Sequence, residues 1–366
     1  MKKIVHIINS LGDGGAERNL FNLVAEDNKN NLHKVIVLSK KNKYSKLFKE
    51  KKITVLYFSF NSFFSSIKSI YKICNYLSKN KPDLISTWLV HSDIIGSIVG
   101  KILNTKVVWN LRTGYLPLNY LKIRTYILYL ISRSFYKYLC DYIIINSEEA
   151  KKFYKLKKNF IYIPNNVNFN FINKKDKLNL INLKKKKYII GQVARYDYLK
   201  NNEFLVETMN YLVNKKRIKN IVCLMIGKNI DSKNKHLNFI IKKYKLEDHI
   251  ILLGQVEEIY KVYNILDIHI LTSLSEGVPN TVLESTYLNV YNLYPNLVNL
   301  VKIFGKKNCY KKGSIASLAS LIIKYLSNPK KYQILKKRNK KIVNKKFNVK
   351  KNVDLYNLVW DEVLKI

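Results

Sequence analysis

Acidic residues, arginine, glycine and cysteine are all scarce in this sequence, and the cysteines exclude two classes of protein. The four cysteines stand far apart and form no C-x-x-C pair, so neither a disulfide framework nor a cysteine zinc site is expected. We expect free thiols in a reducing, cytoplasmic compartment. The apolar run Ile4–Ile8 is too short for a signal peptide. No uncharged apolar stretch of about 18 residues occurs, so no transmembrane helix is expected.

The few acids leave a large excess of positive charge. The sequence holds 66 Lys and Arg against 25 Asp and Glu, a formal net charge of +41, but only seven of the cations are arginine. Lysine, asparagine, isoleucine and tyrosine are all abundant, which is typical of a composition bias and a solvated lysine surface. An anionic partner, such as a membrane surface or a polyanion, is the alternative. The aromatic residues do not cluster with the cations, so no nucleic acid partner is expected.

Uniformly apolar runs alternate with amphipathic segments, which indicates parallel β-sheets covered by helices on both faces. Strands are predicted at 3–8, 33–39, 53–58, 83–89, 106–111, 141–147, 188–195, 220–227, 249–254 and 267–273. An Asn- and Lys-rich break at 162–188 separates two such series. The fold class predicted is α/β, with two Rossmann-like doubly wound domains facing an interdomain cleft.

Three of the twelve glycines, Gly12, Gly14 and Gly15, fall together just after the first predicted strand. Such a turn lets the backbone approach a ligand, and a helix from about Ala16 would offer free N–H groups to an anion. The loop lacks the G-x-G-x-x-G spacing, so a dinucleotide fingerprint is absent. An ordinary tight turn is the alternative interpretation.

Two cations, Arg195 and Lys200, follow the first strand of the second series within one loop. An arginine fork and a lysine point charge at the carboxyl edge of a sheet suit a diphosphate. Arginine is rare here, so its position is informative, whereas one lysine among so many would not be.

Polar side chains also follow two strands of the first series. His91 comes just after the strand predicted at 83–89, and Arg112 and Thr113 come just after the next one. These residues should point to the same edge of the sheet. A lone histidine in such a place is more often a capping or core residue than a catalytic one.

The stretch LTSLSEGVPNTVLES places Glu276 and Glu284 on either side of Pro279. Proline fits the first turn of a helix but not its interior, so a helix is predicted to begin at about Val278–Pro279. Glu276 then lies in the loop before the helix and Glu284 lies inside it. The two acids would reach different parts of one ligand, with the helix N-terminus between them. Incidental acids at a surface loop–helix junction are the alternative.

Several of these motifs, in their order, resemble one enzyme family. The segments are GGAER after the first strand, YIPNNV at the domain junction, GQVARYDYLKN, and LLGQVEEIYKVYNILDIHILTSLSEGVPNTVLES. Over most of residues 1–285 the chain is similar to the retaining GT-B glycosyltransferases of family four, whose Glu-x7-Glu pattern matches Glu276 to Glu284. Order and spacing carry the resemblance, because no single motif is decisive.

The resemblance implies a different role for each part of the chain. Residues 1–165 would form an acceptor-side domain, residues 166–345 a nucleotide-sugar-binding domain, and 346–366 a C-terminal helix that crosses back to the first domain. The residues it implies are Arg195, Lys200, Gly14 and Gly15 for the donor diphosphate, Glu276, Gly277, Pro279, Asn280 and Glu284 for the donor sugar and ribose, Glu276 and His91 for catalysis, and Arg112 and Thr113 on the acceptor side. No metal or other cofactor is implied, because the cationic pair stabilises the leaving diphosphate.

The sequence departs from the family pattern at two places. The junction reads Pro164-Asn165-Asn166 where the family has Pro-Asn-Gly, a mild change because asparagine tolerates a left-handed backbone. Residues 285–314 hold no Gly-x-Pro and no glycine before Gly305, although the family closes its nucleotide site here. Either this segment is rebuilt or the protein is a degenerate, non-catalytic nucleotide-sugar-binding homologue.

We therefore expect a retaining glycosyltransferase that moves a sugar from a nucleotide-diphosphate sugar to a lipid-linked or polysaccharide acceptor in cell-surface glycan biosynthesis (lipopolysaccharide, capsule or O-antigen). Residues 118–139 mix Arg, Lys, Tyr and Leu and could rest on the anionic inner face of the membrane. A buried helix pair with a lysine rim is the alternative for this segment.

Overall fold

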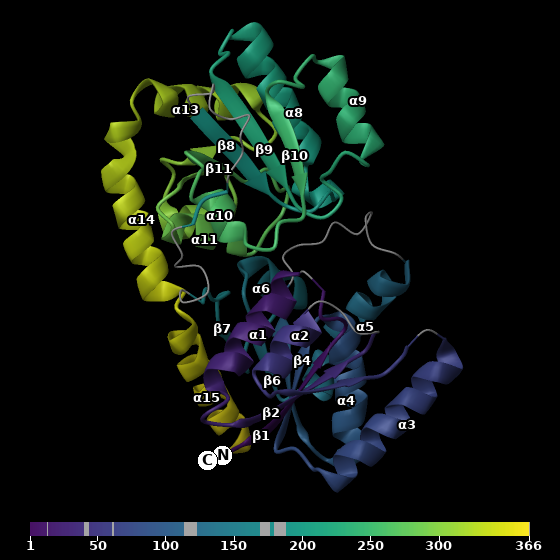
Figure 1. Ribbon diagram of the computed structural model, residues 1–366. Helices are drawn as coiled ribbons and strands as arrows, with labels where there is room; N and C mark the ends of the chain where they lie inside the picture. Colours follow the sequence, from purple (N-terminus) through teal and green to yellow (C-terminus); the bar gives the residue numbers. More distant parts are fainter. Residues whose placement is uncertain are drawn as a thin grey trace. The chain divides into compact units, whose positions relative to one another are not determined.

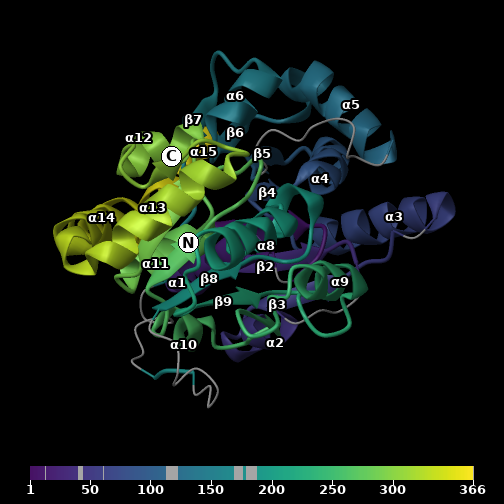
Figure 2. The same cartoon turned by 90° about the horizontal axis from the view of Figure 1, so that it is seen from above.

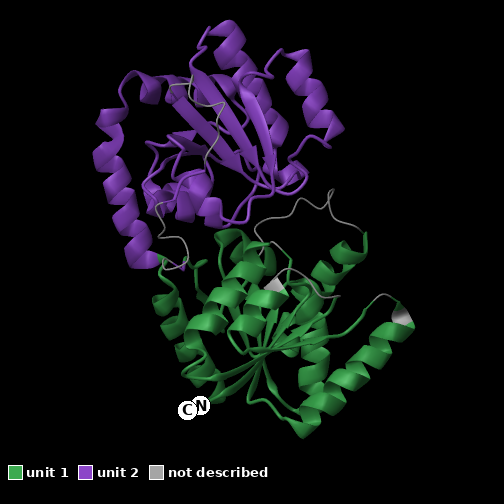
Figure 3. Cartoon of the chain, in the orientation of Figure 1, with its two compact units in different colours: residues 1–167, 347–366 green, residues 168–346 purple. Residues whose placement is uncertain are grey.

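The structure, a computed structural model, describes residues 1–12, 14–39, 44–60, 62–112, 123–168, 176–178 and 188–365. The chain divides into two compact units, residues 1–167 with 347–366, and residues 168–346 (Figure 3). The second unit is thus an insertion in the first. None of the described helices combines the length and the hydropathy that a membrane span requires.

The first unit is built on a sheet of seven parallel strands in the order β3-β2-β1-β4-β5-β6-β7. Their bounds are β1 Lys3–Ile8, β2 Leu32–Val37, β3 Thr54–Tyr57, β4 Leu84–Trp88, β5 Lys106–Leu111, β6 Tyr142–Ile145 and β7 Phe160–Tyr162. Successive side chains of a strand point to opposite faces, and both faces are buried. In β1, Ile4 and Ile8 join one core while Val5 and Ile7 join the other, which explains the uniformly apolar runs.

Helices cover both faces of this sheet (Figure 1). One face packs against α1 Gly15–Asp27, α2 Tyr44–Glu50 and α15 Val349–Leu364, and the other against α3 Phe63–Lys79, α4 Val90–Leu103, α5 Ile123–Leu139 and α6 Glu148–Tyr154. The helix α15 is integral to this unit, because the side chains of Tyr356 and Trp360 are fully buried in its core.

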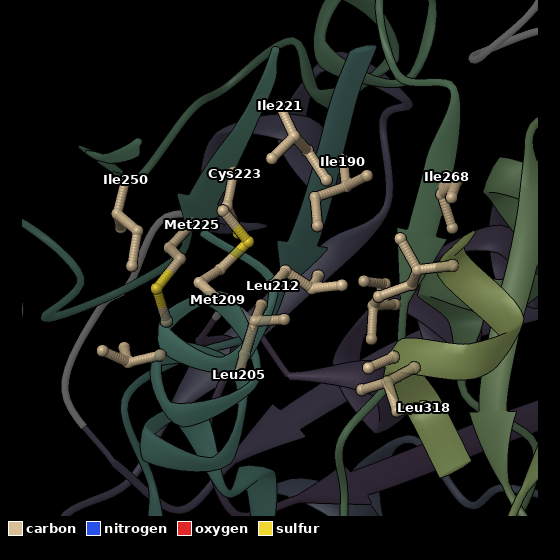
Figure 4. Packing of buried hydrophobic residues seen from close by; sticks show 14 of the residues in the cluster. Ile190, Leu205, Met209, Leu212, Ile221, Cys223, Met225, Ile250, Ile268 and Leu318 are labelled. Carbon is tan, nitrogen blue, oxygen red and sulfur yellow. The ribbon is translucent and has the colours of Figure 1, made fainter. Parts of the chain in front are cut away.

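The second unit has six parallel strands in the order β10-β9-β8-β11-β12-β13. Their bounds are β8 Tyr188–Val193, β9 Ile221–Ile226, β10 Ile250–Gly254, β11 Ile268–Ile270, β12 Tyr291–Pro295 and β13 Cys309–Tyr310. The larger core, shown in Figure 4, includes the apolar side chains of Ile190, Cys223 and Leu205.

Helices cover both faces of the second sheet as well. One face carries α8 Asn202–Asn210, a π-helical turn Tyr211–Lys215, α9 Lys235–Lys243 and α13 Ile315–Ser327, and the other carries α10 Ile259–Tyr263. The helix α14 (Gln333–Lys346) packs against α11 (Asn280–Tyr287) and α12 (Val298–Phe304), and 3-10 turns lie at Tyr198–Lys200 and Pro329–Tyr332.

The predicted fold class, two parallel α/β units, is confirmed, and every predicted strand is found. Three further strands, β7, β12 and β13, were not predicted. The strands β7 and β13 are short edge strands, and β12 lies within the segment 285–314 that departs from the family pattern.

Candidate functional site

Each sheet reverses its strand order once, and several of the predicted site residues follow the strands at these reversals. In the second unit the reversal lies between β8 and β11, and in the first unit it lies between β1 and β4. Loops after the two strands diverge at such a point and leave a crevice at the carboxyl edge of the sheet, where ligands bind in open α/β folds. In the second unit Lys200 follows β8 and Glu276 follows β11. In the first unit Asn9 follows β1, and His91 lies at the start of α4, the helix after β4.

Lys200 and Glu276 form an ion pair at the reversal point of the second unit. The hydroxyl of Ser273 also donates to Oε1 of Glu276, at 2.8 Å. Both ion-pair side chains are partly accessible, at 23% for Lys200 and 15% for Glu276, so a ligand can reach them. The site therefore presents one cation and one anion side by side, which suits a ligand with both anionic and hydroxyl groups.

Buried hydrogen bonds fix the backbone that carries Lys200. The hydroxyl of Thr272 donates to the Lys200 carbonyl at 2.6 Å, and Gln192 Nε2 donates to the Thr272 hydroxyl and to the same carbonyl. Asn202 Nδ2 donates to Gln192 Oε1 at 3.0 Å. The loops after β8 and β11 are therefore tied together before any ligand binds, and none of these three supporting residues was predicted from the sequence.

Arg195 lies at the carboxyl end of β8 and pairs with Asp197 at 3.1 Å. Its side chain is 56% exposed, so the guanidinium can turn toward a ligand at little cost. The backbone of Ala194 and Arg195 packs closely against Gly227. A Cβ built on Gly227, at the end of β9, would stand 2.0 Å from the Ala194 carbonyl oxygen, so only glycine fits there.

The two glutamates lie on either side of a helix N-terminus, as predicted. Pro279 is the N-cap of α11, and Glu276 and the buried Gly277 lie in the loop before it. Glu284 is buried inside α11 and accepts a hydrogen bond from the hydroxyl of Tyr263 at 3.4 Å. Asn280 begins the helix between the two acids.

The segment after Ser285 forms an ordered part of the sheet although its sequence departs from the family pattern. It builds β12, whose Asn292 side chain is buried and accepts from the Ser285 hydroxyl at 2.7 Å. The Tyr310 hydroxyl of β13 donates to the Leu271 carbonyl at 2.8 Å, just before the Glu276 loop. Buried tyrosines and asparagines thus support the site where the family pattern has glycines.

His91, in the first turn of α4, is held by Asn9 from the end of β1. The Asn9 side-chain carbonyl accepts from the Ser92 backbone N–H at 3.1 Å and from the Ser92 hydroxyl at 2.6 Å. Its amide can then donate to His91 Nδ1, at 3.3 Å. Nδ1 is an acceptor in this arrangement, so the neutral ring carries its proton on Nε2. Partial burial lowers the pKa of His91, which favours the neutral form.

The residue before α4 has an uncommon backbone. Leu89 has φ of 75° and ψ of 152°, a conformation that is costly for any residue other than glycine. Such strain persists only where the surrounding structure enforces it, and here it sets the direction in which the chain enters α4 with His91.

Gly14 and Gly15 begin α1, but an internal carboxylate already lies at this helix N-terminus. A Cβ built on Gly14 would meet Glu17 Oε2 at 2.1 Å, and the Ser10 hydroxyl donates to Glu17 Oε1 at 3.1 Å. A carboxylate is favoured near the positive end of a helix. A diphosphate bound here would have to displace Glu17, a constraint that the sequence interpretation missed.

Arg112 has structural contacts at the end of β5. Its guanidinium donates to the Ile163 carbonyl at 3.0 Å and to the Tyr356 hydroxyl, and it lies 5.1 Å from the centre of the Trp88 ring. The Tyr356 hydroxyl in turn donates to Asn110 Oδ1 at 2.7 Å. Arg112 therefore holds α15 against the sheet, and Thr113 lies outside the described residues.

Neither unit offers a metal site within the part of the chain that the structure describes, because no three of its His, Cys, Asp and Glu residues gather around one point. At the two reversal points Lys200, Arg195, Glu276 and His91 offer charge pairing and hydrogen bonding.

Comparison with known proteins agrees with this architecture. Residues 173–342 match the family described as Glycosyl transferases group 1. An uncharacterized glycosyltransferase of Methanocaldococcus jannaschii is 29% identical over 253 residues, which cover 62% of this chain and 59% of that protein. The chain thus spans less than two thirds of the length of this curated relative.

Solved structures share the fold at low sequence identity. HepE of Anabaena in complex with UDP-glucose has a TM-score of 0.84 at 14% identity, with all of both chains covered. The lipopolysaccharide outer core galactosyltransferase WaaB has a TM-score of 0.70 at 17% identity, with 98% of each chain covered. The part of the chain within residues 173–342 is therefore similar to the group 1 glycosyl transferases, and the chain as a whole shares the fold of these solved structures.

Proposed function

We propose that this protein is a retaining glycosyltransferase that uses a nucleoside-diphosphate sugar, with the donor bound at the reversal point of the second unit. The observation that carries the proposal is the Lys200–Glu276 ion pair between the loops after β8 and β11, with Arg195 at the end of β8. Lys200 and Arg195 would bind the diphosphate and Glu276 the hydroxyls of the sugar. The family match over residues 173–342 and the likeness to HepE, which was solved with UDP-glucose, favour a UDP-sugar.

The other proposed donor contacts lie in the loop before α11 and within this helix. Gly277, Pro279 and Asn280 would lie along the sugar and phosphates, and the buried Glu284 would accept from the ribose hydroxyls. Gly14 and Gly15 would face phosphate oxygens only once the Glu17 carboxylate leaves the N-terminus of α1. His91, as a neutral Nε2–H donor, would contact the transferred sugar, and Arg112 and Thr113 would stand on the acceptor side.

The reaction breaks the bond between the anomeric carbon and the diphosphate oxygen and forms a bond from that carbon to an acceptor hydroxyl. The leaving diphosphate takes the hydroxyl proton, and the nearby cations stabilise its charge. No metal or cofactor is required by this scheme. A phosphate acting as the base leaves no role for a carboxylate nucleophile.

The acceptor would be a lipid-linked or polysaccharide glycan of the cell surface, and the protein would act in the cytoplasm with a peripheral contact to the membrane. The match to WaaB, a lipopolysaccharide outer core galactosyltransferase, supports a lipopolysaccharide-type acceptor, with capsule and O-antigen glycans as the related classes.

The test begins with donor binding. UDP, GDP and ADP and their sugars are added to the full chain, and the melting temperature and the slow hydrolysis of each donor are measured. One nucleotide should raise the melting temperature. Arg195→Ala should weaken its binding by about 1.5–3 kcal/mol, as for a charge-assisted contact. The matched control Arg217→Ala, on an exposed turn of the same unit, should change nothing.

A degenerate, nucleotide-sugar-binding protein is the second candidate, favoured by the altered sequence of residues 285–314. It predicts nucleotide binding without donor hydrolysis or transfer, and a wild-type protein that behaves like Glu276→Ala. Hydrolysis that is lost in Glu276→Ala would exclude it. If no nucleotide changes the melting temperature, the donor site itself is refuted.

A further inference from the structure

An exposed apolar surface covers one side of the first unit, and the donor site does not use it. The helices α3, α4 and α5 lie side by side on one face of the sheet, with α4 packed against the other two (Figures 1 and 2). We define this layer as the α3–α5 surface by its exposed large apolar residues, Phe64, Ile67, Tyr71, Ile98, Ile102, Ile123, Ile127, Leu130, Ile131, Phe135 and Tyr138.

The helix α5 is apolar around most of its circumference. Tyr129 faces the core and is buried, whereas Ile123, Phe135 and Tyr138 are 67%, 53% and 72% exposed. The exposed apolar positions recur at helical spacing, so they form one outward stripe along α5. A helix that is apolar on both its inner and outer sides is typical of one that lies against a second apolar medium.

The charges of the α3–α5 surface have one sign. The three helices carry the cations Lys68, Lys72, Lys79, Lys101, Arg124, Arg133 and Lys137. Their one acidic residue, Asp93, is fully buried, and burial raises its pKa well above the ordinary value. An apolar stripe bordered by cations and free of exposed carboxylates complements an anionic lipid surface.

We propose that the α3–α5 surface binds the anionic surface of a membrane and thereby brings a lipid-linked acceptor to the first unit. Ile127, Phe135 and their apolar neighbours would enter the headgroup boundary, while Arg124 and Lys137 contact lipid phosphates. This inference deepens the proposed function and rests on it only for the identity of the acceptor.

The topology of the first unit places the start of α5 at the sheet edge where the acceptor would be needed. The strands β5 and β6 are parallel, so α5, which connects them, runs back from the carboxyl edge of the sheet to its amino edge. The N-terminal end of α5 therefore belongs to the same edge as His91 and Arg112. A lipid-linked acceptor whose carrier lies in the bilayer under α5 would present its glycan at that edge.

Vesicle flotation without any donor tests this inference separately from the glycosyltransferase proposal. The full chain should float with vesicles of phosphatidylcholine and phosphatidylglycerol in equal parts, and much less with phosphatidylcholine alone. Arg124→Gln/Lys137→Gln should weaken binding about 25-fold, since each cation near an anionic surface contributes about fivefold. Ile127→Ser/Phe135→Ser should weaken it about tenfold or more. These positions are exposed, so the fold should be retained.

The matched control is Phe239→Ser/Lys242→Gln on α9, which replaces an exposed aromatic residue and a cation in the second unit. It should float like the wild-type protein. Equal losses in the control and the α5 variants would overturn the proposal in favour of general charge attraction. Dimerisation that Ile127→Ser/Phe135→Ser abolishes, without vesicle binding by the wild type, would show that a second copy covers the surface instead. Flotation without any transfer activity would refute the proposed function but not the membrane surface.

Discussion

Lys200 and Glu276 stand 76 residues apart in the chain, yet their side chains form an ion pair at the point where the strand order of the second sheet reverses. Under the proposed function, Lys200 of this pair would contact the diphosphate and Glu276 the sugar hydroxyls. The two halves of a donor molecule should therefore depend on different members of the pair.

The first prediction tests the diphosphate contact of Lys200 and the sugar contact of Glu276 separately. Lys200→Ala should weaken binding of the nucleoside diphosphate alone about 10- to 100-fold, because a charge-assisted hydrogen bond is lost. Glu276→Gln should leave that affinity nearly unchanged but weaken binding and hydrolysis of the intact nucleotide sugar. Calorimetric titration of each variant with both ligands provides the measurement. Equal losses for both ligands in Glu276→Gln would show that Glu276 does not contact the sugar.

The second prediction concerns the pH dependence that His91 should give to transfer. Burial lowers the pKa of His91 below its ordinary value of about 6.5, so the ring is neutral at pH 7 and activity should fall only as the pH drops below that value. Asn9→Asp places a carboxylate beside Nδ1 and should shift the acid limb of the rate profile upward by about one pH unit. An acid limb that does not move between wild type and Asn9→Asp would remove His91 as its origin.

The third prediction links the packing of Gly227 to the donor site. Gly227 and Gly313 both have positive φ, but only Gly227 has a backbone atom in the space of a Cβ. Gly313→Ala should cost about 1 kcal/mol of stability from φ alone. Gly227→Ala must also displace the Ala194–Arg195 backbone, so it should cost more and weaken nucleotide binding. Urea unfolding and nucleotide titration of the two variants give the comparison, and equal nucleotide affinity would contradict the coupling.

The fourth prediction concerns acid sensitivity of the second unit. Burial lowers the pKa of His269 to about 4, while the unfolded chain has about 6.5. The unfolded state then binds more protons, so this stabilisation is complete above pH 6.5 and is lost as the pH falls toward 4. Between about pH 7 and about pH 5 the loss should be about 2 kcal/mol.

The variant His269→Gln should abolish that part of the pH dependence, and His236→Gln on the exposed side of α9 should not. All three tryptophans, Trp88, Trp109 and Trp360, belong to the first unit. Tryptophan fluorescence therefore reports the unfolding of the first unit, whereas circular dichroism reports the unfolding of both units. A His269→Gln variant with the acid sensitivity of the wild type would refute the assignment.

The sequence predicted ten of the strands because each is a short apolar run, and the central ones, such as β1, β4 and β9, are buried on both faces. It missed β12 because that strand reads YNLYP, in which the polarity of Asn292 is satisfied by Ser285 and Thr286 of the preceding helix. Such compensation is made in three dimensions and leaves no local pattern. The short edge strands β7 and β13 were missed because three and two residues are too few to show a period.

The sequence also placed the site residues at strand ends, but it could not show their partners. It gave Lys200 and Glu276 as separate ligand contacts and did not predict their ion pair. It assigned Gly14 to phosphate without seeing the Glu17 carboxylate beside it, and it gave Arg112 an acceptor role without its contacts to α15. The contacts of Lys200 and Arg112 depend on crossover connections that bring distant segments together, whereas Glu17 stands three residues from Gly14 and only the direction of its side chain was not foreseen.

The insertion of residues 168–346 within the first unit has a consequence for the order of folding during synthesis. The strands β1 to β7 leave the ribosome first, but the core they enclose lacks the side chains of Tyr356 and Trp360 until α15 is made. The inserted unit is continuous in the chain and can complete its own core before then. We therefore expect one face of the sheet in the nascent first unit to stay incompletely covered. The unit should complete its fold only when α15 packs against this face and Lys2 forms its ion pair with Asp361.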